Sequence, residues 1–236
     1  MKKLDLGGNS LKRKNNQLKE IPDAIEQLTD LQELDISFNQ LTEFPNKLSY
    51  LTKLQKLNFF ANQLTVLPES LGSLIELQSF DISYNQLIEL PNKIGQLNAL
   101  QSLDISYNRL EKLPESIGKL SSLQILKVPN NRLSVLPASI GNIEKLQVLD
   151  VFANQLSNLP ETFGNLYNLT SLDLTSNNFT DFPEAIGNLQ KLQVLYLAYN
   201  QIDGLPEELF NLDLRALDIS HTNLTDLPAA IATSSY

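Results

Sequence analysis

The 236-residue sequence has no cysteine, no tryptophan, one methionine and one histidine. Without cysteine it can form no disulfide framework, thiolate metal site or cysteine nucleophile, and it suits a reducing compartment. It lacks the run of about 18 apolar residues that indicates a membrane-spanning helix. It begins with lysines, Asp5 and two glycines rather than with the apolar segment of a signal peptide. We therefore predict a cytoplasmic protein, with secretion left open.

Basic residues are also scarce. The sequence has 18 lysines and arginines against 27 aspartates and glutamates, a net charge of −9. Nucleic acids and anionic membranes attract basic protein surfaces, so we expect no nucleic acid as a partner and no membrane insertion. With 42% hydrophobic and 19% charged residues, the composition is that of a globular chain with a substantial core. The expected partner is a protein that offers basic or exposed apolar groups.

Proline marks the organisation of the sequence. Ten of the eleven prolines recur at a spacing of 23 residues from Pro22 to Pro206, with a last step of 22 to Pro228. Each is preceded by the pattern seen in LQSLDISYNRLEKLP (100–114), in which apolar residues and one asparagine keep fixed positions. A fixed period over the whole chain is typical of repeat proteins. The sequence therefore predicts one repeated unit rather than a helical bundle.

Each unit is expected to contain a short strand and a turn. Leu103 and Ile105 alternate with polar residues, which predicts a strand with these two side chains facing the core. The amide of Asn108 can satisfy buried backbone groups at the turn and in the neighbouring unit. We expect a row of such asparagines, with Thr222 at the same position in the last unit: Asn39, Asn62, Asn85, Asn108, Asn131, Asn154, Asn177 and Asn200.

The rest of each unit returns the chain to the next strand. In LPESIGKL (113–120) apolar residues recur at spacings of four and three, and Pro114 suits a first helical turn. This pattern predicts a short helix or 3₁₀ turn on the convex side. One position of this arm is usually glycine, which we expect to end the turn: Gly72, Gly95, Gly118, Gly141, Gly164 and Gly187.

The 23-residue period with its LPxxIGxL arm resembles that of leucine-rich repeat proteins, especially intracellular Ras-associated and polarity-scaffold proteins and many bacterial repeat proteins. The resemblance runs from end to end. It implies an α/β solenoid, a right-handed horseshoe with a parallel β-sheet on its concave side, and a role in protein recognition. We expect a single domain, 1–236, of about ten repeats, the last starting at residue 214.

The first repeat departs from the pattern, because Asn9-Ser-Leu-Lys is followed seven residues later by Asn16-Gln-Leu-Lys. Removing 9–15 leaves a regular unit that ends at Asp30. We therefore predict that the first repeat, 1–30, contains an insertion at 9–15, which loop entropy tolerates. Whether Asn9 or Asn16 joins the asparagine row stays open.

Candidate binding residues occupy strand positions that we expect to be exposed on the concave face. Most units have Asp between the two inward residues and Ser two positions later, so departures from this pattern are candidates for a partner site: Asn58, Phe60, Lys127, Phe152 and Tyr196. The repeated carboxylates Asp81, Asp104, Asp150 and Asp173 form like-charged neighbours that could receive basic side chains or a cation. Alternatively, they bond only within their own unit. A dedicated Ca²⁺ site would need converging ligands rather than a line.

Aromatic residues gather just before the turn asparagine. Such a row resembles the centre of a protein interface, where Tyr and Phe supply large contact areas. Alternatively, the rings only shield the sheet. The residues are Phe38, Phe60, Tyr84, Tyr107, Phe152 and Tyr199.

No catalytic residue, metal site or cofactor is predicted. Asp218, Ser220 and His221 have the residue types of a catalytic triad, but nothing supplies an oxyanion hole or a pocket. The leading interpretation is a non-enzymatic protein-recognition or scaffold module. The alternative is the substrate-receptor part of a larger enzyme or secreted effector whose catalytic domain lies outside this chain. We also expect weak self-association through the C-terminal end, where Leu217 and Ile219 would be partly uncovered.

Overall fold

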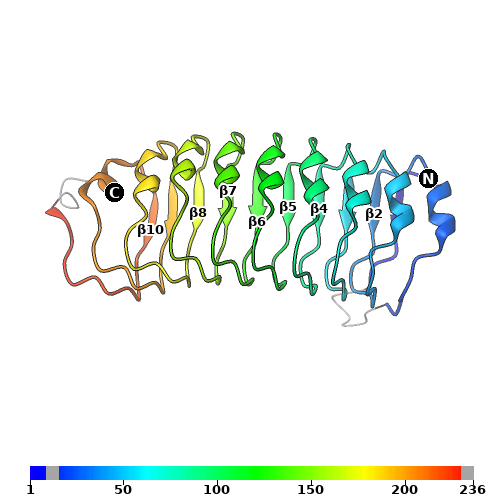
Figure 1. The fold of residues 1–236 in the computed structure, drawn as a ribbon, viewed down its shortest axis with the longest axis horizontal. Coiled ribbons are helices and arrows are strands. Elements are labelled where there is room, and N and C mark those ends of the chain that lie inside the picture. The colour runs from blue at the N-terminus through cyan, green and yellow to red at the C-terminus, as the bar shows by residue number, and fades with distance from the viewer. Residues whose placement is uncertain (9–15, 230–236) are drawn as a thin grey trace.

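The computed structural model describes residues 1–8 and 16–229. Its strands form one parallel sheet in which each strand pairs with the next in sequence order. Figure 1 shows the coils stacked side by side along the long axis, with short helices on the side away from the sheet. The strands are β1 (Lys3–Asp5), β2 (Glu33–Asp35), β3 (Lys56–Asn58), β4 (Ser79–Asp81), β5 (Ser102–Asp104), β6 (Ile125–Lys127), β7 (Val148–Asp150), β8 (Ser171–Asp173), β9 (Val194–Tyr196) and β10 (Ala216–Asp218).

The return arms are five-residue 3₁₀ helices, as the sequence predicted. Each begins directly after the repeated proline, whose fixed φ suits the start of a helix; Pro114, for example, has a φ of −70°. The helices are η2 (Asp23–Gln27), η3 (Asn46–Tyr50), η4 (Glu69–Ser73), η5 (Asn92–Gln96), η6 (Glu115–Lys119), η7 (Ala138–Asn142), η8 (Glu161–Asn165), η9 (Glu184–Asn188) and η10 (Glu207–Asn211).

The core is a continuous column of apolar side chains between the sheet and the 3₁₀ helices. Leu103 in β5, Ile105 just after β5 and Ile117 in η6 all belong to this core and are fully buried. A single coil cannot enclose such side chains, so each coil depends on its neighbours for burial. The predicted class, an α/β solenoid with a parallel sheet, is confirmed.

The arm glycines do not end the 3₁₀ turn, contrary to the prediction. None of the described glycines has a positive φ, and Gly141 lies inside η7. A Cβ atom on Gly141 would lie 2.1 Å from the carbonyl oxygen of Thr162 in the next coil. Glycine at this position therefore allows neighbouring arms to pack closely.

The left-handed conformation occurs instead at the residue before the turn asparagine. Tyr107 has a φ of 52° and Ala153 a φ of 53°, and the same position is left-handed in each coil from Phe38 to His221. This region is unfavourable for residues with a Cβ. Bonds made by the asparagine that follows can hold the turn in place.

The predicted asparagine row is confirmed. Asn108 donates from its Nδ2 to the carbonyls of Ile105 (3.1 Å) and Ser106 (3.2 Å) in its own coil and of Ile82 (3.1 Å) in the preceding coil. Its Oδ1 accepts the N–H of Leu87 at 2.9 Å. Because Asn108 is only 8% exposed, these bonds satisfy groups that water cannot reach.

In the first coil the row is occupied by Asn16. Its Nδ2 donates to the carbonyls of Leu6 (2.9 Å) and Gly7 (3.0 Å) just after the first strand. These carbonyls correspond to those of Ile105 and Ser106, to which Asn108 donates in its own coil. The coil then continues as the others do, since the N–H of Leu18 donates to Asn39 Oδ1 at 3.1 Å. The predicted insertion, 9–15, lies outside the described residues.

Candidate recognition surface

The aspartates of the strands bond within their own coils, in line with the alternative that the sequence left open. Each accepts at Oδ1 the N–H of the residue two positions later: Asp150 from Phe152 at 3.0 Å and Asp173 from Thr175 at 2.9 Å. Asp104 also accepts the Ser106 hydroxyl. We expected the serines two positions after these aspartates to be exposed, but most of them are buried. Ser83 and Ser106, for example, are only 4% and 6% exposed.

The same aspartates keep one oxygen available to a partner. Among the described residues, no hydrogen bond is recorded to Oδ2 of Asp81, Asp104, Asp150 or Asp173. Burial raises the pKa of Asp81 and of Asp150, opposed by hydrogen bonds to the carboxylate and reinforced by a neighbouring aspartate. Asp104 lies next to Asp81, and Asp173 next to Asp150. The local bonds therefore orient the carboxylates without saturating them.

Two of the three departures from Asp at this strand position, Asn58 and Lys127, are compensated within the same coil. Asn58 accepts the N–H of Phe60 with its Oδ1 at 2.9 Å, so the amide replaces the carboxylate. Lys127 has no acceptor, but two residues later stands Pro129, which has no N–H to be satisfied. Both changes alter the exposed chemistry while preserving the turn.

The aromatic residues form two groups rather than one row. Phe38, Phe60, Tyr84 and Tyr107 make a continuous series of ring contacts, with centroids 4.9, 5.1 and 4.1 Å apart. We call this series the aromatic ladder. Tyr84 and Tyr107 are stacked, exposed at 47% and 43%, whereas Phe38 and Phe60 are half-buried. The adjacent Tyr107 raises the pKa of Tyr84.

The remaining aromatic candidates lie toward the other end of the sheet. Tyr199 stacks on His221 with a centroid distance of 4.2 Å. Tyr196 is exposed on β9 and Phe152 is half-buried after β7. Asp218 accepts the N–H of Ser220 at 2.9 Å, and this bond lowers the pKa of Asp218. The Asp218, Ser220 and His221 group thus forms a local turn and a ring stack.

A third row on the same face was missed, although strand alternation could have found it. Residues two positions before the aspartates also point away from the core. In the first strands these are charged or small, and from β6 onward apolar side chains appear: Ile125, Val148 and Val194, all half-buried. This third row is therefore polar in its first half and partly apolar in its second.

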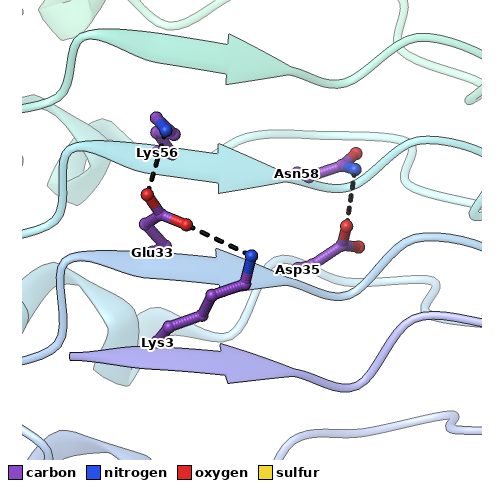
Figure 2. A network of polar contacts seen from close by, with 5 residues as sticks. All are labelled: Lys3, Glu33, Asp35, Lys56 and Asn58. Carbon is purple, nitrogen blue, oxygen red and sulfur yellow. Dashed lines mark hydrogen bonds and ion pairs between the residues drawn. The ribbon is translucent and has the colours of Figure 1, made fainter. Parts of the chain in front are cut away.

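The first three strands carry a polar network that spans this row and the aspartate row (Figure 2). Glu33 bridges Lys3 at 3.4 Å and Lys56 at 2.9 Å, and Asn58 Nδ2 donates to Asp35 Oδ2 at 3.0 Å. Hydrogen bonds from Lys56 and Lys3 hold the pKa of Glu33 below its usual value. These side chains line a shallow hollow of about 360 Å³. The lysines and carboxylates there already satisfy one another.

Residues 1–8 and 16–229 contain neither a metal-binding cluster nor a membrane-spanning helix. No group of three or more His, Asp or Glu side chains there could hold a metal ion. None of the helices in the same ranges is long and apolar enough to cross a bilayer.

These features define a class: a repeat solenoid whose sheet presents carboxylates and aromatic rings on one broad face. A leucine-rich repeat region model matches residues 68–153 and 126–200, and a leucine-rich repeat model matches 30–51 and 191–212. The chain belongs to the leucine-rich repeat family. Domains of this family commonly mediate protein–protein interaction.

Several solved structures are similar to the whole chain. The Leptospira interrogans leucine-rich repeat protein LIC12759 is 34% identical over 98% of the chain, with a TM-score of 0.77. The plant peptide hormone receptor RGFR1, in complex with RGF2, is 33% identical over 91%, with a TM-score of 0.81. The Arabidopsis thaliana receptor kinase GASSHO1/SCHENGEN3 ectodomain, in complex with CASPARIAN STRIP INTEGRITY FACTOR 2, is 30% identical over 89%, with a TM-score of 0.76.

The chain spans 64%, 36% and 30% of the lengths of these three proteins, respectively. No protein with curated annotation matches it.

Proposed function

We propose that the chain is a non-enzymatic recognition module that binds a protein partner on its concave face. The observation that carries the proposal is the aromatic ladder, which places exposed Tyr84 and Tyr107 beside half-exposed carboxylates. Large amphipathic rings next to polar groups are typical of interface centres. Two of the similar receptors are named in complex with RGF2 and CASPARIAN STRIP INTEGRITY FACTOR 2, which supports a protein or peptide partner.

The proposed contact surface consists of residues that distinguish one coil from another together with the exposed carboxylates. Repetition in every coil suits a scaffold role, whereas a change in single coils suits a role toward a partner. The proposed surface comprises Phe38, Asn58, Phe60, Asp81, Tyr84, Asp104, Tyr107, Lys127, Asp150, Phe152, Asp173, Tyr196 and Tyr199. Its excess of carboxylates favours a partner with basic groups.

Tyr196→Asp tests this proposal with little disturbance of the fold. Tyr196 is exposed on β9, and Asp would restore the residue found in most other coils, so stability should change by no more than about 0.5 kcal/mol. Loss of an aromatic anchor can cost about 2 kcal/mol in binding. We therefore expect proteins captured from the source organism by the intact chain to bind the variant at least tenfold more weakly, on the order of thirtyfold for 2 kcal/mol.

Lys119→Ala on η6 is the matched control, because it changes one exposed side chain on the convex side. Phe60→Ser is a less clean test, since Phe60 packs between two rings and its loss would also cost stability. The opposite outcome would be that Tyr196→Asp and Tyr107→Ala still capture the partner whereas Lys119→Ala does not. That result would place the binding site on the convex side.

A second candidate is the substrate-receptor part of a larger enzyme or effector. It is favoured by one observation: the chain spans only part of each of the three similar proteins. The length of the natural gene product distinguishes the two functions. A product no longer than this chain would rule out the second function.

We also propose weak self-association through β10. Among the described strands β10 pairs only with β9, and Leu217, Ile219 and Leu224 are only partly buried. Unpaired sheet edges are ready templates for another chain. Sedimentation velocity should show dimers at high protein concentration, and a strict monomer throughout would contradict this.

A further inference from the structure

The charges in the middle of the concave face follow a defined order. Five consecutive strands, β4 to β8, place Asp81, Asp104, Lys127, Asp150 and Asp173 side by side in register. The order is therefore acidic, acidic, basic, acidic, acidic. Neighbouring strands of a sheet lie about 4.8 Å apart, so the five charges form a line about 19 Å long.

These charges are positioned but not neutralised. One oxygen of each aspartate is held by the backbone N–H two residues later. Lys127 is exposed and takes part in none of the four ion pairs found among the described residues. Adjacent like charges on a sheet destabilise one another, and a partner of complementary charge would relieve this repulsion.

The spacing of the line indicates the secondary structure of the partner. Helical residues rise about 1.5 Å each, so positions i, i+3, i+7, i+10 and i+14 advance by about 4.5, 10.5, 15 and 21 Å along one face. The coils advance by about 4.8, 9.6, 14.4 and 19.2 Å, and long side chains can absorb the differences of about 2 Å or less. An extended strand presents a residue to one face only every 6.8 Å or so, too few to meet all five coils.

We propose that the concave face binds an amphipathic helix whose charged residues follow the order basic, basic, acidic, basic, basic, one against each coil from β4 to β8. This inference rests on the proposed function and names the partner's chemistry. The charge order is symmetric, and the neighbouring row breaks the symmetry. Ser79 and Ser102 flank the first two aspartates, whereas Ile125 and Val148 flank Lys127 and Asp150. Ser171 flanks Asp173, so the helix carries apolar residues beside its third and fourth charges only.

Synthetic peptides test the order of charges directly. The matched peptide is an alanine-rich helix with Lys at i, i+3, i+10 and i+14, Glu at i+7, and leucines beside i+7 and i+10. The permuted peptide has the same composition but Glu at i. A third peptide has the same composition in an alternating, strand-like pattern. Binding to the intact chain is measured by fluorescence anisotropy, with circular dichroism to verify that each protein variant is folded.

We expect the matched peptide to bind about tenfold more tightly than the permuted one, since like charges placed opposite each other oppose association. In the Lys127→Glu variant the preference should shift to a peptide with Lys at i+7. Lys127→Gln should weaken the original preference without reversing it. Lys119→Glu, the same charge change on the convex side, should leave it intact.

Equal affinity for matched and permuted peptides, or no binding of either at millimolar concentration, would overturn the inference. If the strand-like peptide binds more tightly than the matched peptide, the inference that the partner is a helix is wrong. The proposed function is judged separately, by whether Tyr196→Asp weakens capture of natural partners. Loss of capture together with no dependence on charge order would leave the function standing and the inference wrong.

Discussion

Two polar rows run side by side along the sheet, and they tolerate change very differently. The asparagine row keeps the same residue in every described coil before the last. From Asn39 to Asn200 it is buried and bonds both within its own coil and to the preceding one. The aspartate row is half-exposed and bonds to the backbone of its own coil. At Asn58 and Lys127, two of the three positions where the second row changes, the same coil supplies the compensation. A bond between coils therefore fixes a residue, whereas a bond within a coil leaves it free to vary.

The largest effect expected from this comparison is that of Asn154→Asp. Asn154 is 8% exposed, and its Nδ2 donates to the carbonyls of Val128 and Val151, both at 3.0 Å. Aspartate has no donor to replace the amide and would place a charge among carbonyl oxygens, at a cost of about 3–5 kcal/mol. Urea unfolding measures the loss. A loss below about 1 kcal/mol would show that the row is less tightly constrained than its bonds indicate.

A somewhat smaller loss is expected when the amide is removed without adding a charge. Asn108→Ala leaves the buried N–H of Leu87 without a partner. It also removes one of the two side-chain hydrogen bonds to each of the carbonyls of Ile82 and Ile105. Together these losses cost about 1–3 kcal/mol. Thr222 occupies the same position in the last coil but makes one bond, from its hydroxyl to the Ile219 carbonyl at 2.8 Å. Thr222→Ala should therefore cost clearly less. Equal losses in chemical denaturation would contradict the importance of bonding between coils.

The sequence was sufficient for the features that recur in every coil. The strands, the 3₁₀ helices and the asparagine row recur with a period of 23 residues. Each coil therefore gives independent support for the same assignment of strand, turn and helix. The start of the chain could be interpreted for the same reason, although only the bonds of Asn16 decided which asparagine joins the row.

Features that depend on the fit between neighbouring coils were not predictable from one unit. Gly141 was expected to end a turn, because a pattern within one coil does not reveal that Thr162 of the next coil leaves no room for a Cβ. The burial of Ser106 and the partial burial of Phe60 were missed similarly. The binding surface itself stays a prediction, because a repeat pattern specifies where side chains point but not which partner they meet.

The aspartate row gives the smallest expected effect and the sharpest contrast, because Asp150→Asn reverses the substitution considered at Asn154, in the same coil. The amide of Asn can still accept the N–H of Phe152, as Asn58 does from Phe60 at 2.9 Å, so the turn should persist. Removing the carboxylate also removes its repulsion with Asp173. At pH 7 the variant should be as stable as the original or more stable by a few tenths of a kcal/mol, since solvent screens a half-exposed charge.

The pH dependence of Asp150→Asn follows from the direction of the Asp150 pKa shift. Burial raises the pKa of Asp150 in the folded state, so the folded protein binds more protons than the unfolded chain between the raised pKa and the ordinary value of about 3.9. The contribution of Asp150 to the free energy of unfolding therefore increases as the pH falls through the raised pKa. Any advantage of Asp150→Asn at pH 7 should then shrink toward pH 4, measured by urea unfolding at both values. An advantage that grows on acidification, or a loss at pH 7 comparable to that of Asn154→Asp, would mean that the carboxylate stabilises the coil in a way that its local bonds do not explain.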